Sequence, residues 1–221
     1  MGIVVDNNLE KENHRNFLRK IYSLLLYQLF ITVGMCATAM YISSVRNYVI
    51  THNGLLVMGA ILSLVFLIML FCYKNHHPAN MWILTAFTIS IAYTVAVTCA
   101  VYVSLGYKTL VVKAFLITIL TFIGLTCFTL QSKYNFDFLQ EIVASGIMVL
   151  IFWGIINWAM GSDGGTMYSL FGIFIFVCAI IYDTHRLKKE FGYDDYILAS
   201  VNLYLDIINL FLYILDFMRK E

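Results

Sequence analysis

Long apolar stretches alternate with short polar ones along the whole chain. A transmembrane helix needs about 20 mostly apolar residues to cross the hydrocarbon core of a bilayer. Six stretches come close to that length, and a seventh, near the C-terminus, is weaker because polar residues interrupt it. The pattern therefore predicts six clear membrane-spanning helices and a seventh candidate, at residues 21–42, 54–73, 81–105, 110–131, 142–160, 167–182 and 197–218.

The composition also indicates a polytopic membrane protein. Of the 221 residues, 61% are hydrophobic and 12% are charged, whereas a typical soluble domain has about 25% charged residues. We expect an all-α bundle within the lipid bilayer at residues 21–218, a cytosolic N-terminal segment at 1–20 and a short tail at 219–221. Because little chain remains outside the bundle, any functional site must lie within it. The net charge of +1 argues against nucleic acid as a partner.

The basic residues predict the orientation. Loops on the cytosolic side of membrane proteins carry an excess of Lys and Arg. With the N-terminus in the cytosol, the opposite side receives three basic residues before the C-terminal tail, Arg46, Lys108 and Lys113. The cytosolic side then receives nine, namely Lys11, Arg15, Arg19, Lys20, Lys74, Lys133, Arg186, Lys188 and Lys189.

Arg219 and Lys220 conflict with this orientation, because seven full crossings would place them on the far side. Either the seventh segment crosses despite these charges, or it enters the membrane and returns as a re-entrant segment. The sequence leaves both open.

The seventh segment carries one polar stripe. Its polar residues follow at spacings of 4, 3, 4 and 3, which places them on one face of a helix, with apolar residues around the rest. Such a helix suits the middle of a bundle, where the stripe faces a partner helix or a watered cavity. The stripe consists of Asn202, Asp206, Asn209, Tyr213 and Asp216.

Asp206 lies deep within this segment, where a charge costs about 2.5–3.5 kcal/mol or more. It is either a neutral residue that hydrogen-bonds helices together, or part of a proton- or cation-responsive pathway; we favour the pathway. Asp183 is shallower, and alone it would be read as an interfacial aspartate paired with Arg186, Lys188 or His185.

Asp183 and Asp206 take on another meaning if they touch. Two carboxylates in contact cannot both ionise cheaply and share a proton, and fully deprotonated they would offer four oxygens to Ca²⁺. In a simple hairpin with level ends, however, the two would be offset by about 8 Å along the helix axes. Periodicity does not establish the pairing.

Enzymatic and receptor functions are weaker readings. Intramembrane aspartyl proteases also use two membrane aspartates, but their second one lies in Gly-x-Gly-Asp, whereas this chain has "LYLD" at 203–206 and too few spans. The five cysteines lie within predicted spans without histidine partners, so no nucleophilic or metal constellation is expected. The receptor-type Asp-Arg-Tyr and Asn-Pro-x-x-Tyr signals are missing. We therefore expect no enzyme and no bound cofactor.

Four stretches carry a resemblance to a known family: "FLRKIYSLLLYQL" (17–29), "GLTCFTLQSKYNFDF" (124–138), "IIYDTHRL" (180–187) and "YILASVNLYLDIINLFL" (196–212). The chain resembles the transmembrane BAX inhibitor motif family, and within it the Golgi anti-apoptotic branch, which has small viral members. One departure is that "QSKYNFDF" holds two residues more than the usual spacing of the family. This leaves only the loop between the fourth and fifth spans in doubt.

The resemblance implies six helices around a central seventh, which some members are described as having in re-entrant form. It implies a Ca²⁺ leak channel of the endoplasmic reticulum and Golgi that lowers store Ca²⁺ and inhibits apoptosis. The paired aspartates of the family fall on Asp183 and Asp206. In some relatives a basic residue near the second span holds the shut state, and Lys74 is the nearest candidate here. Glu141, at the start of the fifth span, would line the mouth of a pore or lie at the membrane–water interface.

The expected function is thus an intracellular Ca²⁺ leak that is tuned by pH through an aspartate pair, with Ca²⁺ as permeant or bound ion. The alternative is a membrane regulator without transport, which acts through helix contacts with cell-death or Ca²⁺-channel proteins. Self-association is compatible with both.

Overall fold

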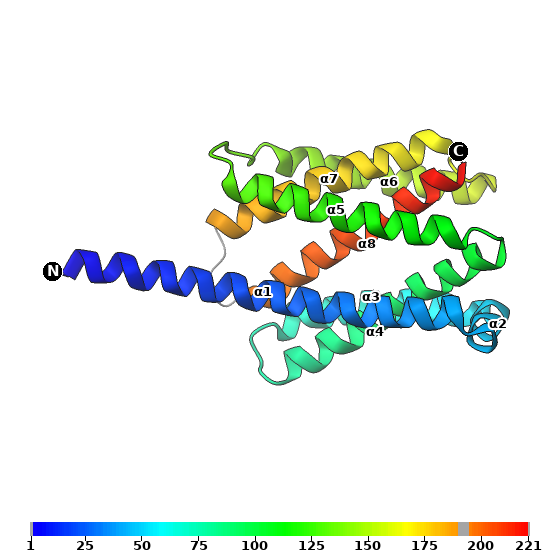
Figure 1. Ribbon diagram of the computed structural model, residues 1–221, viewed down its shortest axis with the longest axis horizontal. Coiled ribbons are helices and arrows are strands. Elements are labelled where there is room, and N and C mark those ends of the chain that lie inside the picture. The colour runs from blue at the N-terminus through cyan, green and yellow to red at the C-terminus, as the bar shows by residue number, and fades with distance from the viewer. Residues whose placement is uncertain (1, 190–194, 221) are drawn as a thin grey trace. The chain divides into compact units, whose positions relative to one another are not determined.

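The computed structural model describes the backbone at residues 2–189 and 195–220, and side chains from residue 12 onward except that of residue 53. Within these ranges the chain forms eight helices and no strand (Figure 1). They are α1 (Gly2–Tyr41), α2 (Ser43–Thr51), α3 (Asn53–Tyr73), α4 (Ala79–Ser104), α5 (Lys108–Gln131), α6 (Leu139–Met160), α7 (Gly165–Lys189) and α8 (Tyr196–Lys220).

Seven of the described helices, all except α2, are long and apolar enough to cross a membrane. The predicted all-α, seven-span class is therefore confirmed. Two helices extend beyond the predicted spans: α1 includes most of the hydrophilic segment 1–20, and α7 continues seven residues past position 182. The seventh span, α8, is the most buried of the seven: 67% of the residues in its most apolar 18-residue stretch are buried, against 17% for α3 and α6.

Large apolar side chains cover the outside of these helices. Phe30, Trp82 and Trp158 are 82%, 73% and 84% exposed. A soluble protein rarely leaves so many large apolar side chains in water. In a membrane such faces contact lipid, while the backbone hydrogen bonds are satisfied within the helices.

The short helix α2 was not predicted. Its nine residues, "SSVRNYVIT", are too few and too polar to register as a span. Arg46 on α2 donates a hydrogen bond to the backbone oxygen of Met40 at 2.9 Å, which satisfies a carbonyl near the C-terminal end of α1. Val49 is the buried residue of α2 and joins an apolar cluster with Ala39, Ala96, Val97 and Ala100.

The chain divides into two compact units, and α8 contributes to both. The first unit comprises the described residues of 1–101 and 190–204. Its core contains Tyr204 on α8, which is fully buried. The hydroxyls of Tyr204 and Thr32 are hydrogen-bonded at 2.8 Å, and the Phe87 ring meets the Tyr204 ring edge-on at 6.2 Å. Gln28 donates to the Thr88 hydroxyl at 3.3 Å.

The second unit comprises the described residues of 102–189 and 205–221. In it α7 packs against α5 and α6. Gly146 on α6 allows a close approach, because a Cβ atom there would overlap the side chain of Ile175 on α7. Ile175 itself is 1% exposed. The second unit holds Asp183 and Asp206, so the candidate site can be described within it.

Candidate functional site

The side chains of Asp183 on α7 and Asp206 on α8 lie against each other, close enough for their carboxyl groups to interact directly. Asp206 is 8% exposed, and Asp183 is half-buried. The offset of about 8 Å expected for a hairpin with level ends is therefore not present. Arg186 lies close enough to Asp183 to attract it electrostatically.

The contact between the two carboxyls requires a proton. Ionised carboxylates only accept hydrogen bonds, so one partner must carry a hydrogen for the other to accept. If both were ionised, the buried Oδ2 atom of Asp206 would have no donor among the described residues. A proton shared with Asp183 supplies that donor. Two carboxyls in such a contact can share one proton.

The same antiparallel register continues along the two helices. Ser169 lies beside Asp216, Gly172 beside Tyr213, and Asp183 beside Asp206. As the residue number falls along α7, the number of its partner rises along α8. Tyr213 and Asp216 of the α8 stripe therefore contact α7 in the same register as Asp206.

Tyr213 fills the middle of this interface. Its hydroxyl donates to the hydroxyl of Tyr168 at 3.2 Å. Its ring lies against Gly172, where a Cβ atom would overlap it. Asn209, one turn earlier, donates to the backbone oxygen of Leu205 at 2.8 Å. Asn202, the first residue of the predicted stripe, is half-buried and belongs to the first unit.

Asp216 is held in an ion-paired network. It accepts from the Ser169 hydroxyl at 2.6 Å, from Arg219 at 3.0 Å and from Lys220 at 2.7 Å. Arg219 also pairs with Asp163 at 3.5 Å. With three donors around it, Asp216 anchors the last turn of α8 to the beginning of α7. It is thus a positioning residue in this structure.

Lys74 and Glu141 lie in different surroundings from the aspartate pair. Lys74, which follows α3, forms a salt bridge with Asp195 at 2.7 Å within the first unit. Both side chains are about one-third exposed, so this pair is partly screened by solvent. Glu141 is exposed in the first turn of α6, where a carboxylate complements the helix dipole.

Sequence reasoning missed His185 as a structural residue. Its ring is 4% exposed and meets the loop between α5 and α6. The Nε2 atom lies 3.3 Å from the backbone nitrogen of Phe136 and 3.1 Å from Oδ1 of Asn135. The first contact needs an unprotonated Nε2, and the second needs a protonated one. His185 stands in the stretch "DTHRLKK", but the sequence does not show that the loop between α5 and α6 contacts it; only the fold brings the two together.

Lys189 completes the contact with the same loop by pairing with Asp137 at 3.0 Å. The hydrogen bond from Lys189, followed by that involving Asn135, lowers the pKa of the Asp137 carboxyl from its usual value. The loop 132–138 is therefore attached to α7 at His185 and Lys189, two and six residues beyond Asp183.

The site has limited capacity for a metal ion. Two carboxylates offer at most four oxygens, whereas Ca²⁺ usually takes six to eight. In residues 12–189 and 195–220, no group of three or more His, Cys, Asp or Glu side chains could hold a metal.

Comparison with known proteins extends the similarity to nearly the whole chain. A family model described as "Inhibitor of apoptosis-promoting Bax1" matches residues 14–221. Protein lifeguard 4 of Mus musculus is 35% identical over 204 residues, which cover 92% of this chain and 84% of that protein. The Golgi anti-apoptotic protein of Vaccinia virus (strain Lister) is 34% identical with the same coverage, 92% and 84%. Protein LIFEGUARD 1 of Arabidopsis thaliana is 32% identical over 207 residues, covering 90% of this chain and 86% of that protein.

Proposed function

The chain belongs to the family of inhibitors of apoptosis-promoting Bax1, and on that premise we propose an anti-apoptotic protein that conducts cations, including Ca²⁺, through an intracellular membrane. The observation that carries the transport proposal is the contact between the carboxyls of Asp183 and Asp206, which lie on two helices long and apolar enough to span a membrane. Intramembrane carboxyls are costly and commonly mark ion pathways or proton relays.

The shared proton acts as the switch. With one proton present, the Asp183–Asp206 hydrogen bond holds α7 and α8 together, and the pathway is shut. Loss of that proton leaves two negative charges side by side. At a separation of 4 Å and an effective dielectric constant of 20, two such charges repel by about 4 kcal/mol. Repulsion on this scale is enough to separate the helices or to recruit a cation between them.

Acidification should therefore favour the shut state, and alkaline conditions the open one. The groups that face the pair include Arg186, which lies close enough to attract Asp183. Asp206 is the more buried partner, so the proton resides mainly on Asp206. A cation that enters the open pathway replaces the lost proton as the positive charge between the two carboxylates.

We place the protein in Golgi and endoplasmic reticulum membranes with its N-terminus in the cytosol. The Golgi assignment is supported by the name of the viral relative, Golgi anti-apoptotic protein. The orientation is supported by the excess of basic residues in the segments that would face the cytosol.

The test is Ca²⁺ flux from proteoliposomes that contain the purified full chain, measured between pH 5.5 and 8. Wild type should conduct more at high pH. Asp206→Asn should remove the pH dependence, because an amide has no proton to lose in this range. Asp183→Asn should have the same effect. Asp137→Asn removes an exposed loop carboxylate by the same substitution and should keep the wild-type pH profile.

Two results would contradict the proposal in different ways. If wild type gave no flux at any pH, the protein would be a regulator without transport, acting through helix contacts with cell-death or Ca²⁺-channel proteins. If flux were present but both aspartate variants kept the wild-type pH profile, the channel would stand and the aspartate switch would be wrong.

A further inference from the structure

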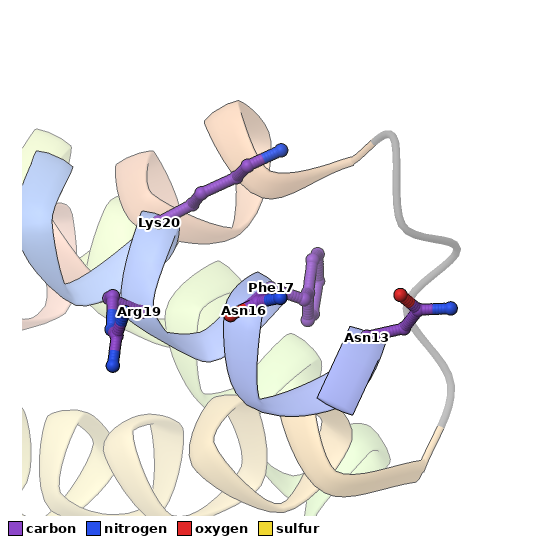
Figure 2. A pocket seen from close by; sticks show the side chains of 5 residues that line it. All are labelled: Asn13, Asn16, Phe17, Arg19 and Lys20. Atoms are coloured by element: carbon purple, nitrogen blue, oxygen red, sulfur yellow. The ribbon is translucent and has the colours of Figure 1, made fainter. Parts of the chain in front are cut away.

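A cavity of about 580 Å³ lies beside α1, close to the point where the helix changes from polar to apolar. Figure 2 shows the side chains that line it: Asn13, Asn16, Phe17, Arg19 and Lys20. Positions 13, 16, 17 and 20 follow the i, i+3, i+4, i+7 spacing of one helix face. Arg19 leaves the helix in a different direction from Lys20 (Figure 2).

The chemistry of the lining suits an anion. Lys20 and Arg19 are cationic and exposed, and the carboxamides of Asn13 and Asn16 can each donate hydrogen bonds. Among the side chains of 12–189 and 195–220, neither Lys20 nor Arg19 has a carboxylate partner. The Lys20 ammonium lies 5.4 Å from the centre of the Tyr196 ring, a cation–π contact that restrains it.

The position of the cavity along α1, just before the apolar part of the helix, indicates which anion would bind there. Ile21 and Leu25, which follow directly on α1, are 0% and 1% exposed and begin the apolar part of the helix. Basic residues at this position of a spanning helix reach the level of the lipid headgroups. Phe17, 3% exposed, adds an apolar floor to the cavity. A ligand with a negative phosphate and an adjoining apolar part fits both features.

We propose that this cavity binds the phosphate-bearing headgroup of an anionic phospholipid. Lys20 and Arg19 pair with the phosphate from different directions. Asn13 and Asn16 donate to the remaining phosphate oxygens, and Phe17 packs against the glycerol carbons. Binding here would attach the beginning of α1 to the membrane surface and is independent of the aspartate pair.

The test uses the purified full chain in a neutral detergent and short-chain (dioctanoyl) lipids, with binding followed by native mass spectrometry. Dioctanoyl phosphatidylserine and dioctanoyl phosphatidylinositol phosphate should bind more tightly than dioctanoyl phosphatidylcholine. Lys20→Gln and Arg19→Gln should each weaken binding by about fivefold, since a basic residue near an anionic membrane contributes about that factor. Asn16→Leu should also weaken it without changing any charge.

Matched variants separate the cavity from general surface charge. Arg15→Gln removes an exposed cation from the same helix that does not line the cavity, and Lys133→Gln removes one from the turn between α5 and α6. Both should bind as wild type does. Equal losses for Arg15→Gln and Lys20→Gln would overturn the proposal, because attraction would then be diffuse. Inorganic phosphate that competed as well as the lipids would also overturn it, since the site would recognise free phosphate.

Discussion

At the residue scale, Asp183 and Asp206 show how one proton can join two helices. Among the described residues of the α7–α8 interface, this is the pair in which both partners are acidic, and the hydrogen bond that we propose between them requires a proton. The sequence predicted both residues as unusual because each lies in or beside an apolar run. Their contact could not be predicted from periodicity, which fixes the face of a helix but not its depth relative to a neighbour; the family resemblance supplied it.

Two substitutions of Asp206 should distinguish the effect of the hydrogen bond on stability from the effect of the titrating proton. In Asp206→Asn the amide can donate to Asp183, so the contact is retained without a proton. In Asp206→Ala the contact is lost and the Asp183 carboxyl has no partner on α8, which lowers the free energy of unfolding by about 1–3 kcal/mol. Thermal unfolding in detergent at neutral pH should therefore rank wild type and Asp206→Asn above Asp206→Ala. Equal destabilisation by both substitutions would indicate that shape, and not the hydrogen bond, matters at this position.

Asp137 gives a pH dependence outside the membrane-spanning segments. Lys189 and Asn135 hold the pKa of its carboxyl below the ordinary value, so the folded state favours the ionised form. The stabilisation is present at neutral pH and is lost as the pH falls below about 4, towards the lowered pKa. Hydrogen exchange in the loop 132–138 should thus accelerate in acid beyond its intrinsic rate. Asp137→Asn should show fast exchange at neutral pH already; unchanged protection would contradict the role of this pair.

At the element scale, hydropathy predicted the seven spans well because each spanning helix must present apolar residues to lipid or core. It ended α7 too early, at 182, because the polar run "DTHRLKK" no longer looks apolar, although the backbone hydrogen bonds continue to Lys189. Hydropathy missed α2 because its nine residues, some polar and some apolar, are too short and too polar to be recognised as a membrane span. Close approach between elements, as at Gly172 and Tyr213, depends on register and could not be predicted.

Gly172→Ala should weaken the interface between α7 and α8. The added Cβ atom would overlap the ring of Tyr213, and overpacking of this kind costs about 1–3 kcal/mol. Gly124→Ala on α5 is the matched control, because no atom lies within 4 Å of its added Cβ, and it should be neutral or stabilising. The comparison is thermal unfolding of both variants in detergent. If Gly172→Ala were as stable as Gly124→Ala, the close packing of the two helices would be wrong.

At the scale of the whole molecule, α8 is long and apolar enough for a complete crossing. It is one unbroken helix of 25 residues, about 37 Å long at 1.5 Å per residue. In the first unit its start is tied to the residues after α3 through Lys74 and Asp195. In the second unit its end is tied to the turn before α7, where Lys220 donates to the backbone oxygen of Asp163 at 2.8 Å. We therefore predict that α8 crosses the membrane fully and is not re-entrant.

The basic residues of the C-terminal tail fit this crossing. Arg219 and Lys220 opposed the predicted orientation as isolated charges, but in the structure both pair with Asp216, and Arg219 also pairs with Asp163. Asp216 in the same helix and Asp163 in the turn before α7 thus compensate these charges, which a count of basic residues alone does not include.

The N-terminus and the C-terminus should therefore lie on opposite sides of the membrane. Epitope tags at the two ends, probed after selective permeabilisation of the plasma membrane, should show the N-terminal tag accessible and the C-terminal tag protected. A tag inserted at the turn after α3 should behave as the N-terminal one does. Accessibility of both termini under the same condition would contradict a seventh crossing.

The most direct test of the central claim is infrared spectroscopy of the carboxyl groups in the purified protein, because a protonated carboxyl has a C=O stretch that a carboxylate lacks. We predict such a band at neutral pH in wild type, its loss in Asp206→Asn and its disappearance as the pH is raised, while Asp137→Asn retains it. A wild-type spectrum without that band at neutral pH, or one that Asp206→Asn leaves unchanged, would show that the two aspartates share no proton.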